Sequence, residues 1–115
     1  MDDLDVNLLR GTLDLLILKA LSWGPQHGYG IAEWIENTTG AAVLVGEGTL
    51  YPALHRLERN GWVESEWGIS ENNRKAKFYH LGSSGRKRLQ VGMSSWHHFV
   101  EAAATALRAT GPQRG

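Results

Sequence analysis

The spacing of apolar residues predicts four helices and one β-hairpin. Apolar side chains recur every three or four residues in four segments, which is the period of a helix with one buried face. These helices are expected from about Val6 to Trp23, Gly28 to Thr38, Glu47 to Asn60 and Ser83 to Leu107. Two further segments alternate apolar and polar residues as strands do, from Trp62 to Trp67 and from Lys77 to Leu81. The polar, turn-rich stretch between them predicts a hairpin with a long tip.

The first predicted helix is apolar on two sides. One stripe comprises Leu9, Leu13, Leu16, Ile17 and Ala20, and a second comprises Leu8, Leu15 and Leu18. A helix that is apolar nearly all round must be covered on both faces. A domain of this size can cover one face itself. We therefore expect this helix to meet a second subunit as well, with Leu9, Leu13 and Leu16 in the contact.

The third predicted helix has a buried face and a basic outward face. Leu50, Leu54 and Leu57 are spaced as one inward stripe. When the helix is projected at about 100° per residue, the outward arc comprises Gly48, Pro52, His55, Arg56 and Arg59, with Thr49 and Tyr51 at its edges. This arc contains no acid, and its hydroxyl, imidazole and guanidinium groups can reach base edges or phosphates of DNA. The plainer alternative is an ordinary amphipathic helix whose polar face is basic.

Two short helices followed by a basic hairpin predict a winged helix-turn-helix. In that architecture the third helix enters the major groove, and the hairpin, or wing, lies over the adjoining backbone or minor groove. Arg74, Lys75 and Lys77 suit contact with phosphates there, although a solvated charged loop would have the same composition. The expected fold class is mainly α with a small β-hairpin, a winged helix-turn-helix followed by a C-terminal dimerisation helix.

The last predicted helix carries a heptad seam, which consists of Leu89, Met93, Trp96, Val100, Ala103 and Leu107. A domain already complete without this helix leaves the seam uncovered, so we expect a homodimer with two-fold symmetry on a palindromic operator. The chain then divides into a DNA-binding domain over residues 1–82, a dimerisation helix over residues 83–110 and a disordered tail over residues 111–115. Ser83 or Ser84 is expected to cap the last helix.

The five tryptophans have different expected roles. Trp96 lies on the heptad seam, where simple packing in the dimer interface is the favoured interpretation. The alternative is that two symmetry-related Trp96 rings hold a flat aromatic effector between them. The other four, Trp23, Trp34, Trp62 and Trp67, are expected to pack in the core or the hairpin.

The charges of the 115-residue chain sum to zero but are unevenly distributed. Residues 1–55 hold two basic and seven acidic side chains, whereas residues 56–88 hold eight basic and four acidic ones. Such asymmetry suits contact with a polyanion on one side. Arg86, Lys87 and Arg88 near the start of the last helix fit a phosphate contact and a solvated surface equally well.

Composition and motifs argue against several other classes of protein. The chain has no cysteine and no histidine spacing typical of metal ligands, so neither a metal nor another cofactor is expected. His27 and His80 are expected to be hydrogen-bonded structural residues. No nucleophile–base pair, phosphate-binding glycine loop or carboxylate pair indicates an enzyme. The longest apolar run is too short to span a membrane and the N-terminus is acidic, which favours the cytoplasm.

Several motifs together resemble the PadR family of bacterial regulators. They are GTLDLLILKAL at residues 11–21, HGYGI at 27–31, GTLYPALHRLERNGW at 48–62 and RKAKFYHL at 74–81. The resemblance implies a transcriptional regulator, usually a repressor, that dimerises through its first and last helices. By the position of the motifs, the recognition helix is expected to carry Thr49, Tyr51, Pro52, His55 and Arg56. The wing residues expected to contact DNA are Arg74, Lys75 and Lys77.

The resemblance also bears on a small-molecule effector and on where the last helix begins. Some relatives bind phenolic or drug-like molecules, which supports a small aromatic effector at Trp96. The turn at residues 82–85 departs from the family pattern and leaves the start of the last helix open. The main alternative function is a winged-helix module that binds protein and not DNA, which the zero net charge and the acidic first half favour slightly.

Overall fold

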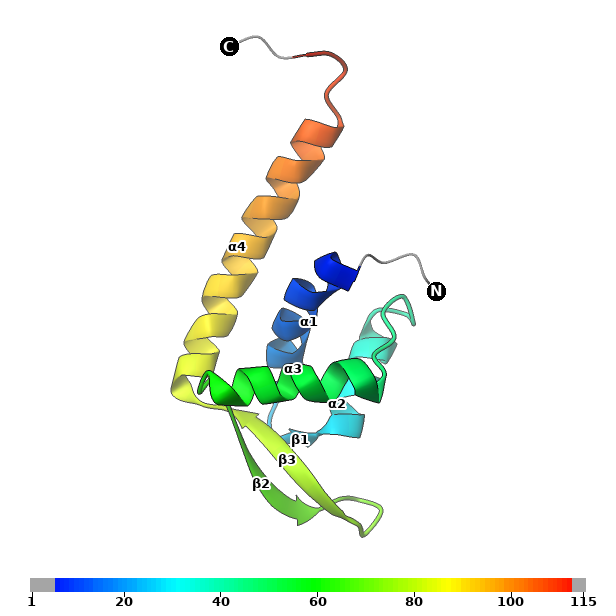
Figure 1. Ribbon diagram of the computed structural model, residues 1–115, viewed down its shortest axis with the longest axis vertical. Helices are drawn as coiled ribbons and strands as arrows, with labels where there is room; N and C mark the ends of the chain where they lie inside the picture. Colours follow the sequence, from blue (N-terminus) through cyan, green and yellow to red (C-terminus); the bar gives the residue numbers. More distant parts are fainter. Residues whose placement is uncertain (1–5, 113–115) are drawn as a thin grey trace.

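The structure, a computed structural model, describes residues 6–112, and the side chains from residue 11 onward. Its helices are α1 (Val6–Leu21), α2 (Gly28–Thr38), α3 (Glu47–Arg59) and α4 (Ser83–Leu107), and its strands are β1 (Gln26–His27), β2 (Val63–Ile69) and β3 (Lys75–Leu81) (Figure 1). The four predicted helices and the hairpin are confirmed. Both hairpin strands are longer than expected, which shortens the tip to residues 70–74.

A third strand, β1, extends the hairpin into a small antiparallel sheet with the order β1-β3-β2. Gln26 of β1 pairs with Tyr79 of β3, and Val63 of β2 pairs with Leu81. Gly24, which has a φ of 141°, turns the chain from α1 toward this strand. A strand of two residues is too short to show alternation, so the sequence pattern could not predict β1.

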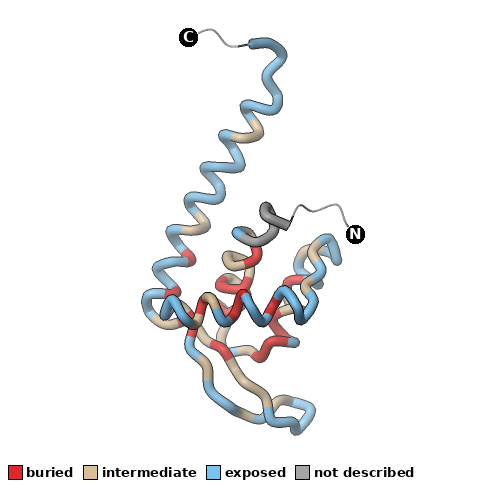
Figure 2. Tube along the Cα trace, in the orientation of Figure 1, coloured by how far each residue is buried: buried red, intermediate tan, exposed pale blue. Residues whose placement is uncertain are grey.

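The core lies where α1, α2 and α3 pack against the base of the sheet, and Figure 2 shows the buried positions gathered there. Leu50, Leu54 and Leu57 of α3 are at most 2% exposed, which confirms the predicted inward stripe. Each fully buried leucine contributes about 1.5–3 kcal/mol relative to an exposed one. The core therefore fixes the orientation of α3, and with it the face that α3 presents to solvent.

Two residues expected in a dimer contact belong instead to the core of the chain itself. Leu13 is 1% exposed and Leu89 is 7% exposed, so neither side chain is available to a second subunit. Leu13 lies on the side of α1 that packs into the domain, and Leu89 lies where α4 still touches that domain. Leu16 and Met93 are partly buried against the same core. Leu9 lies outside the residues whose side chains are described.

Two glycines let α4 pack against the domain. A Cβ atom on Gly85 would collide with the carbonyl oxygen of Trp62, and one on Gly92 would lie 2.8 Å from Cδ1 of Leu15. The residue at the N-cap is Gly82, and no side chain caps the helix there. The expectation of a serine cap is therefore wrong. The hydroxyl of Ser84 instead donates to the carbonyl of Gly61 at 2.9 Å, because α4 begins beside the end of α3.

The outer part of α4 projects from the domain, as Figure 1 shows. This projection accounts for the elongated shape, with principal extents of 61 × 32 × 21 Å. The projecting part exposes Phe99, Val100 and Leu107 by 63%, 37% and 86%. None of the helices described between residues 6 and 112 has both the length and the apolar character needed to cross a membrane.

Candidate nucleic-acid interface

The outward face of α3 carries most of the residues that the sequence predicts as DNA contacts. Five of them are exposed, namely Thr49, Tyr51, Pro52, His55 and Arg59. The opposite face of the helix is buried in the core, so the exposed arc is held rigidly outward. It offers hydroxyl, imidazole and guanidinium groups on one helix, which is the set of donors that base edges and phosphates accept.

Arg56 departs from this expectation. Its Nη2 donates a hydrogen bond to Oδ1 of Asp14 in α1 at 2.6 Å, and the two side chains are only 33% and 28% exposed. The guanidinium is thus engaged within the chain, and it ties α3 to α1. The sequence projection placed Arg56 outward because the carboxylate that turns it back lies 42 positions away.

The wing displays the predicted cations above aromatic rings. Arg74 and Lys75 are exposed and Lys77 is half-buried. Nζ of Lys75 lies 5.4 Å from the ring centre of Trp67, and Nζ of Lys77 lies 5.9 Å from that of Tyr79. At these distances a cation is attracted to the ring face. The rings therefore hold the two ammonium groups on one face of the sheet.

His27 connects the start of α2 to the wing. Its Nδ1 accepts a hydrogen bond from the N–H of Gly30 at 3.0 Å, which leaves the proton of the neutral ring on Nε2. That Nε2 lies 3.4 Å from Oε1 of Glu71 at the wing tip. The backbone N–H of Glu71 and the His27 ring both hold the pKa of the Glu71 carboxyl below its ordinary value. His27 is therefore a structural residue, as expected.

His80 is likewise hydrogen-bonded. Its Nε2 lies 3.1 Å from Oε1 of Glu64 on the neighbouring strand. Among the residues that the structure describes, no three histidine, aspartate or glutamate side chains are grouped as ligands of a metal ion.

Some of the predicted contacts share one cleft and others do not. Tyr51 of α3 and the wing residues Arg74, Lys75 and Lys77 line a cleft of about 460 Å³. The other exposed contacts on α3, Thr49, Pro52, His55 and Arg59, are not part of its lining. The candidate interface thus has two parts, the outward arc of α3 and a cleft beside the wing.

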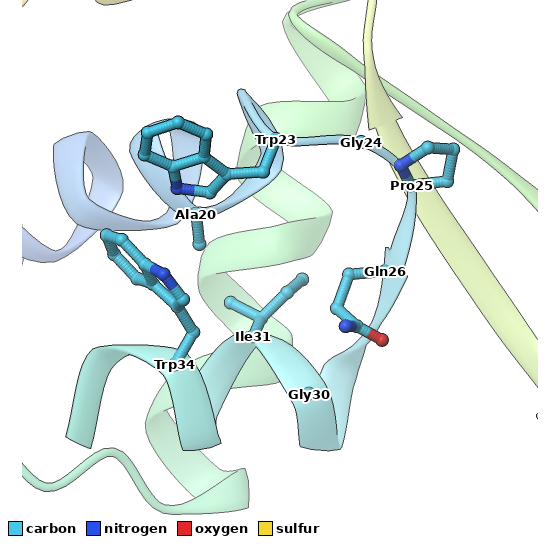
Figure 3. Close-up of a pocket in the computed structure, with 8 residues that line it drawn as sticks. All are labelled: Ala20, Trp23, Gly24, Pro25, Gln26, Gly30, Ile31 and Trp34. Atoms are coloured by element: carbon cyan, nitrogen blue, oxygen red, sulfur yellow. The ribbon is translucent and has the colours of Figure 1, made fainter. Parts of the chain in front are cut away.

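Two of the four tryptophans expected to pack in the core or the hairpin are largely exposed. Trp67 is 64% exposed because it lies where the hairpin extends beyond the core, and Trp23 is 69% exposed in the turn that follows α1. Trp23 and Trp34 flank a separate hollow of about 260 Å³ whose floor includes Ala20 and Ile31 (Figure 3). Among the described residues, no charged side chain lines this hollow.

Trp96 lines a third hollow, of about 350 Å³, between α1 and α4. Leu15 of α1 and Phe99 of α4 also line it, and the Trp96 side chain is 41% exposed. Val100 and Leu107, farther along α4, are exposed as well, so the residues that the structure describes leave these apolar side chains of α4 uncovered.

Comparison with known proteins identifies the family. The model of the transcriptional regulator PadR-like family matches residues 17–91. An uncharacterized protein X of Lysinibacillus sphaericus is 31% identical over 95 residues, which cover 83% of this chain and 87% of that protein. A transcriptional regulator from Clostridium thermocellum has the same fold, with 29% identity and a TM-score of 0.78 over 86% of this chain and 96% of its own.

A PadR family transcriptional regulator from Eggerthella lenta is similar to the same extent. It shares 28% identity and a TM-score of 0.77, over 91% of this chain and 89% of its own. The family model spans more than half of the chain, and the matched structures share its arrangement of helices and wing. The chain belongs to the PadR-like family of transcriptional regulators.

Proposed function

We propose that this regulator is a repressor that binds a palindromic DNA operator as a homodimer. The observation that carries the proposal is the outward arc of α3, which is exposed and free of acid next to a wing whose cations face one cleft. In this proposal α3 enters the major groove and His55 and Arg59 reach base edges. Arg74, Lys75 and Lys77 contact phosphates, and Arg56 supports α3 from behind.

The dimer contact is assigned to the uncovered surface of α4. Trp96, Val100, Ala103 and Leu107 continue the heptad seam beyond the point where α4 leaves the domain, and three of the four are exposed. Pairing of two such helices about a two-fold axis buries this surface and sets the two copies of α3 about one helical turn of DNA apart, roughly 34–36 Å. Residues 1–82 then supply the DNA contacts and residues 83–110 most of the dimer contact.

The experiment that tests DNA binding is an electrophoretic shift with the DNA upstream of the regulator's own gene. The logarithm of the binding constant should fall linearly with the logarithm of the salt concentration, because each phosphate contact releases counterions. Arg59→Ala combined with Lys75→Ala should abolish the shift. A protein-interaction module would instead give no shift with this DNA at any salt concentration, and that result would overturn the proposal.

An aromatic effector at Trp96 is the second part of the proposal. The hollow beside Trp96 is open and mostly apolar, with Asp14 and Arg88 as the charged residues of its lining, and a planar ring there would lie next to the dimer contact. Packing of Trp96 against its symmetry mate is the competing role. Acridine is a suitable planar probe, and its quenching of tryptophan fluorescence should be the same in the wild type and in Trp34→Phe but smaller in Trp96→Phe, where Trp62 is the remaining indole of the hollow. Equal quenching in Trp96→Phe would exclude this site.

A further inference from the structure

The cleft beside the wing has one wall made by the inner face of the hairpin. Trp67 of β2 pairs directly with Lys77 of β3, so the two side chains lie on the same face of the sheet. Lys75 lies two residues along on that face, with its Nζ above the Trp67 ring. This wall is therefore both aromatic and cationic, and it extends beyond the apolar core.

The opposite wall comes from the helix-turn-helix. Tyr29 of α2 is 72% exposed, and Tyr51 of α3 is 38% exposed. A Cβ atom on Gly28 would lie 2.5 Å from Oη of Tyr51, so the phenol rests against the first turn of α2. The glycine is needed for this close approach. Tyr51 is thus held as a fixed part of the wall, with its hydroxyl beside the positive end of α2.

The charged side chains that line the cleft are all basic. Arg74, Lys75 and Lys77 line it, and no acidic residue does among those described. The nearby carboxylate of Glu71 faces His27 at the wing tip. An open cleft with cations, phenol hydroxyls and an uncovered indole suits an extended polyanion with an apolar face. A DNA strand has both features, since its phosphates alternate with deoxyribose rings.

We propose that this cleft seats the sugar–phosphate backbone of one operator strand, with Trp67 packed against a deoxyribose and Tyr29 donating to a phosphate. The proposal rests on the DNA binding proposed above and adds two contact residues, Tyr29 and Trp67, to the interface. Lys75 and Lys77 neutralise the phosphates on either side of the sugar. The cleft positions the strand and carries no base readout, because contacts to sugar and phosphate are the same for every sequence.

The test compares variants in their affinity for the operator duplex as a function of salt. Trp67→Ala removes an uncharged apolar surface that packs against the sugar, so it should weaken binding roughly tenfold and leave the salt slope unchanged. Trp67→Phe should keep most of the affinity. Lys75→Ala should also weaken binding, and it should reduce the salt slope by about 1. Trp23→Ala is the matched control, because Trp23 is equally exposed but lies outside the cleft, and it should bind like the wild type.

Tyr29→Phe is a second, milder test of the cleft, because a folding defect in Trp67→Ala would also weaken binding. It removes only a hydroxyl from an exposed ring and should weaken operator binding about threefold or more. Wild-type affinity in both Trp67→Ala and Tyr29→Phe would overturn the cleft proposal while DNA binding stood. Absence of any operator binding by the wild type would instead overturn the proposed function.

Discussion

Single side chains divide into those that face DNA in the proposed complex and those that hold the interface in place. Arg56 and Arg59 illustrate the difference, because they lie three positions apart on α3 and, among the residues that the structure describes, only Arg56 has an acidic partner, Asp14. Arg56→Ala should lower the free energy of unfolding by about 1 kcal/mol, since the pair is partly buried. For a chain of this size that corresponds to a fall in Tm of about 4 °C.

Arg59→Ala is the matched control for this prediction. It should leave Tm unchanged in thermal denaturation and weaken operator binding, because Arg59 is exposed and presented outward. Asp14→Asn should reproduce the loss of stability of Arg56→Ala. The ion-pair role of Arg56 is refuted if Arg56→Ala melts like the wild type.

Tyr79 makes the stability sensitive to alkaline pH. The side chain is 2% exposed, and burial raises the pKa of its hydroxyl above the ordinary value of 10.0, assisted by the Glu58 carboxylate and by Tyr51. The unfolded chain therefore ionises at a lower pH than the folded one, and stability is lost as the pH rises above about 10. Tyr79→Phe should show a smaller drop in Tm between pH 8 and pH 10.5 than the wild type. Tyr29→Phe, altered at an exposed tyrosine, should keep the full drop.

The sequence predicts buried residues better than it predicts the partners of polar ones. Leu50, Leu54 and Leu57 follow from helical period alone, because burial on one helix face is a local pattern. The pairing of Arg56 with Asp14 depends on how α3 crosses α1, which no local pattern contains. The exposure of Trp67 likewise depends on how far the hairpin extends beyond the core.

At the scale of elements, close approach between segments decides which residues are tolerated. Gly85 lies where α4 begins beside Trp62, and any side chain there meets the Trp62 carbonyl. Gly85→Ala should therefore destabilise the protein by about 3 kcal/mol, because backbone must move to admit the methyl group.

Gly48→Ala provides the matched control in urea denaturation. Gly48 is also helical, but a Cβ atom there would have no neighbour within 4 Å. The methyl group should stabilise α3 by about 0.5–1 kcal/mol through helix propensity. If Gly85→Ala were as stable as Gly48→Ala, the tight contact between α4 and Trp62 would be refuted.

Elements could be predicted where they are long and periodic, and not where they are short or held by distant contacts. The four helices and the hairpin meet that condition. Strand β1 does not, since its two residues are fixed by pairing with Phe78 and Tyr79 far along the chain. The N-cap of α4 does not follow from the sequence for a related reason, because Ser84 finds its hydrogen-bond partner in the loop after α3.

At the scale of the whole molecule, α4 combines two environments in one continuous helix. Its first turns are buried against the domain through Leu89, whereas its outer turns leave the seam residues open. The sequence predicts the full seam, but it does not show at which residue of α4 the contact with the rest of the domain ends. In the proposed dimer only the outer part, from about Trp96 to Leu107, is available to the partner.

Val100→Glu tests this assignment. Val100 is 37% exposed on the seam, and two glutamates brought together across a two-fold axis would bury like charges in an apolar contact. The variant should keep its helical content and sediment as a monomer. Its operator affinity should fall by about 100-fold, because a monomer binds one half-site without the gain from the linked second one.

Val91→Glu makes the same change on the same helix but off the seam, two positions from Leu89. Val91 is 53% exposed and lies on the opposite side of α4 from the heptad positions. It should remain a dimer and bind the operator like the wild type, so any general effect of a new carboxylate on α4 would appear in both variants. Dimers of equal stability in the two variants would show that the subunits meet through another surface, and the spacing of the two recognition helices would then have to be derived from that surface.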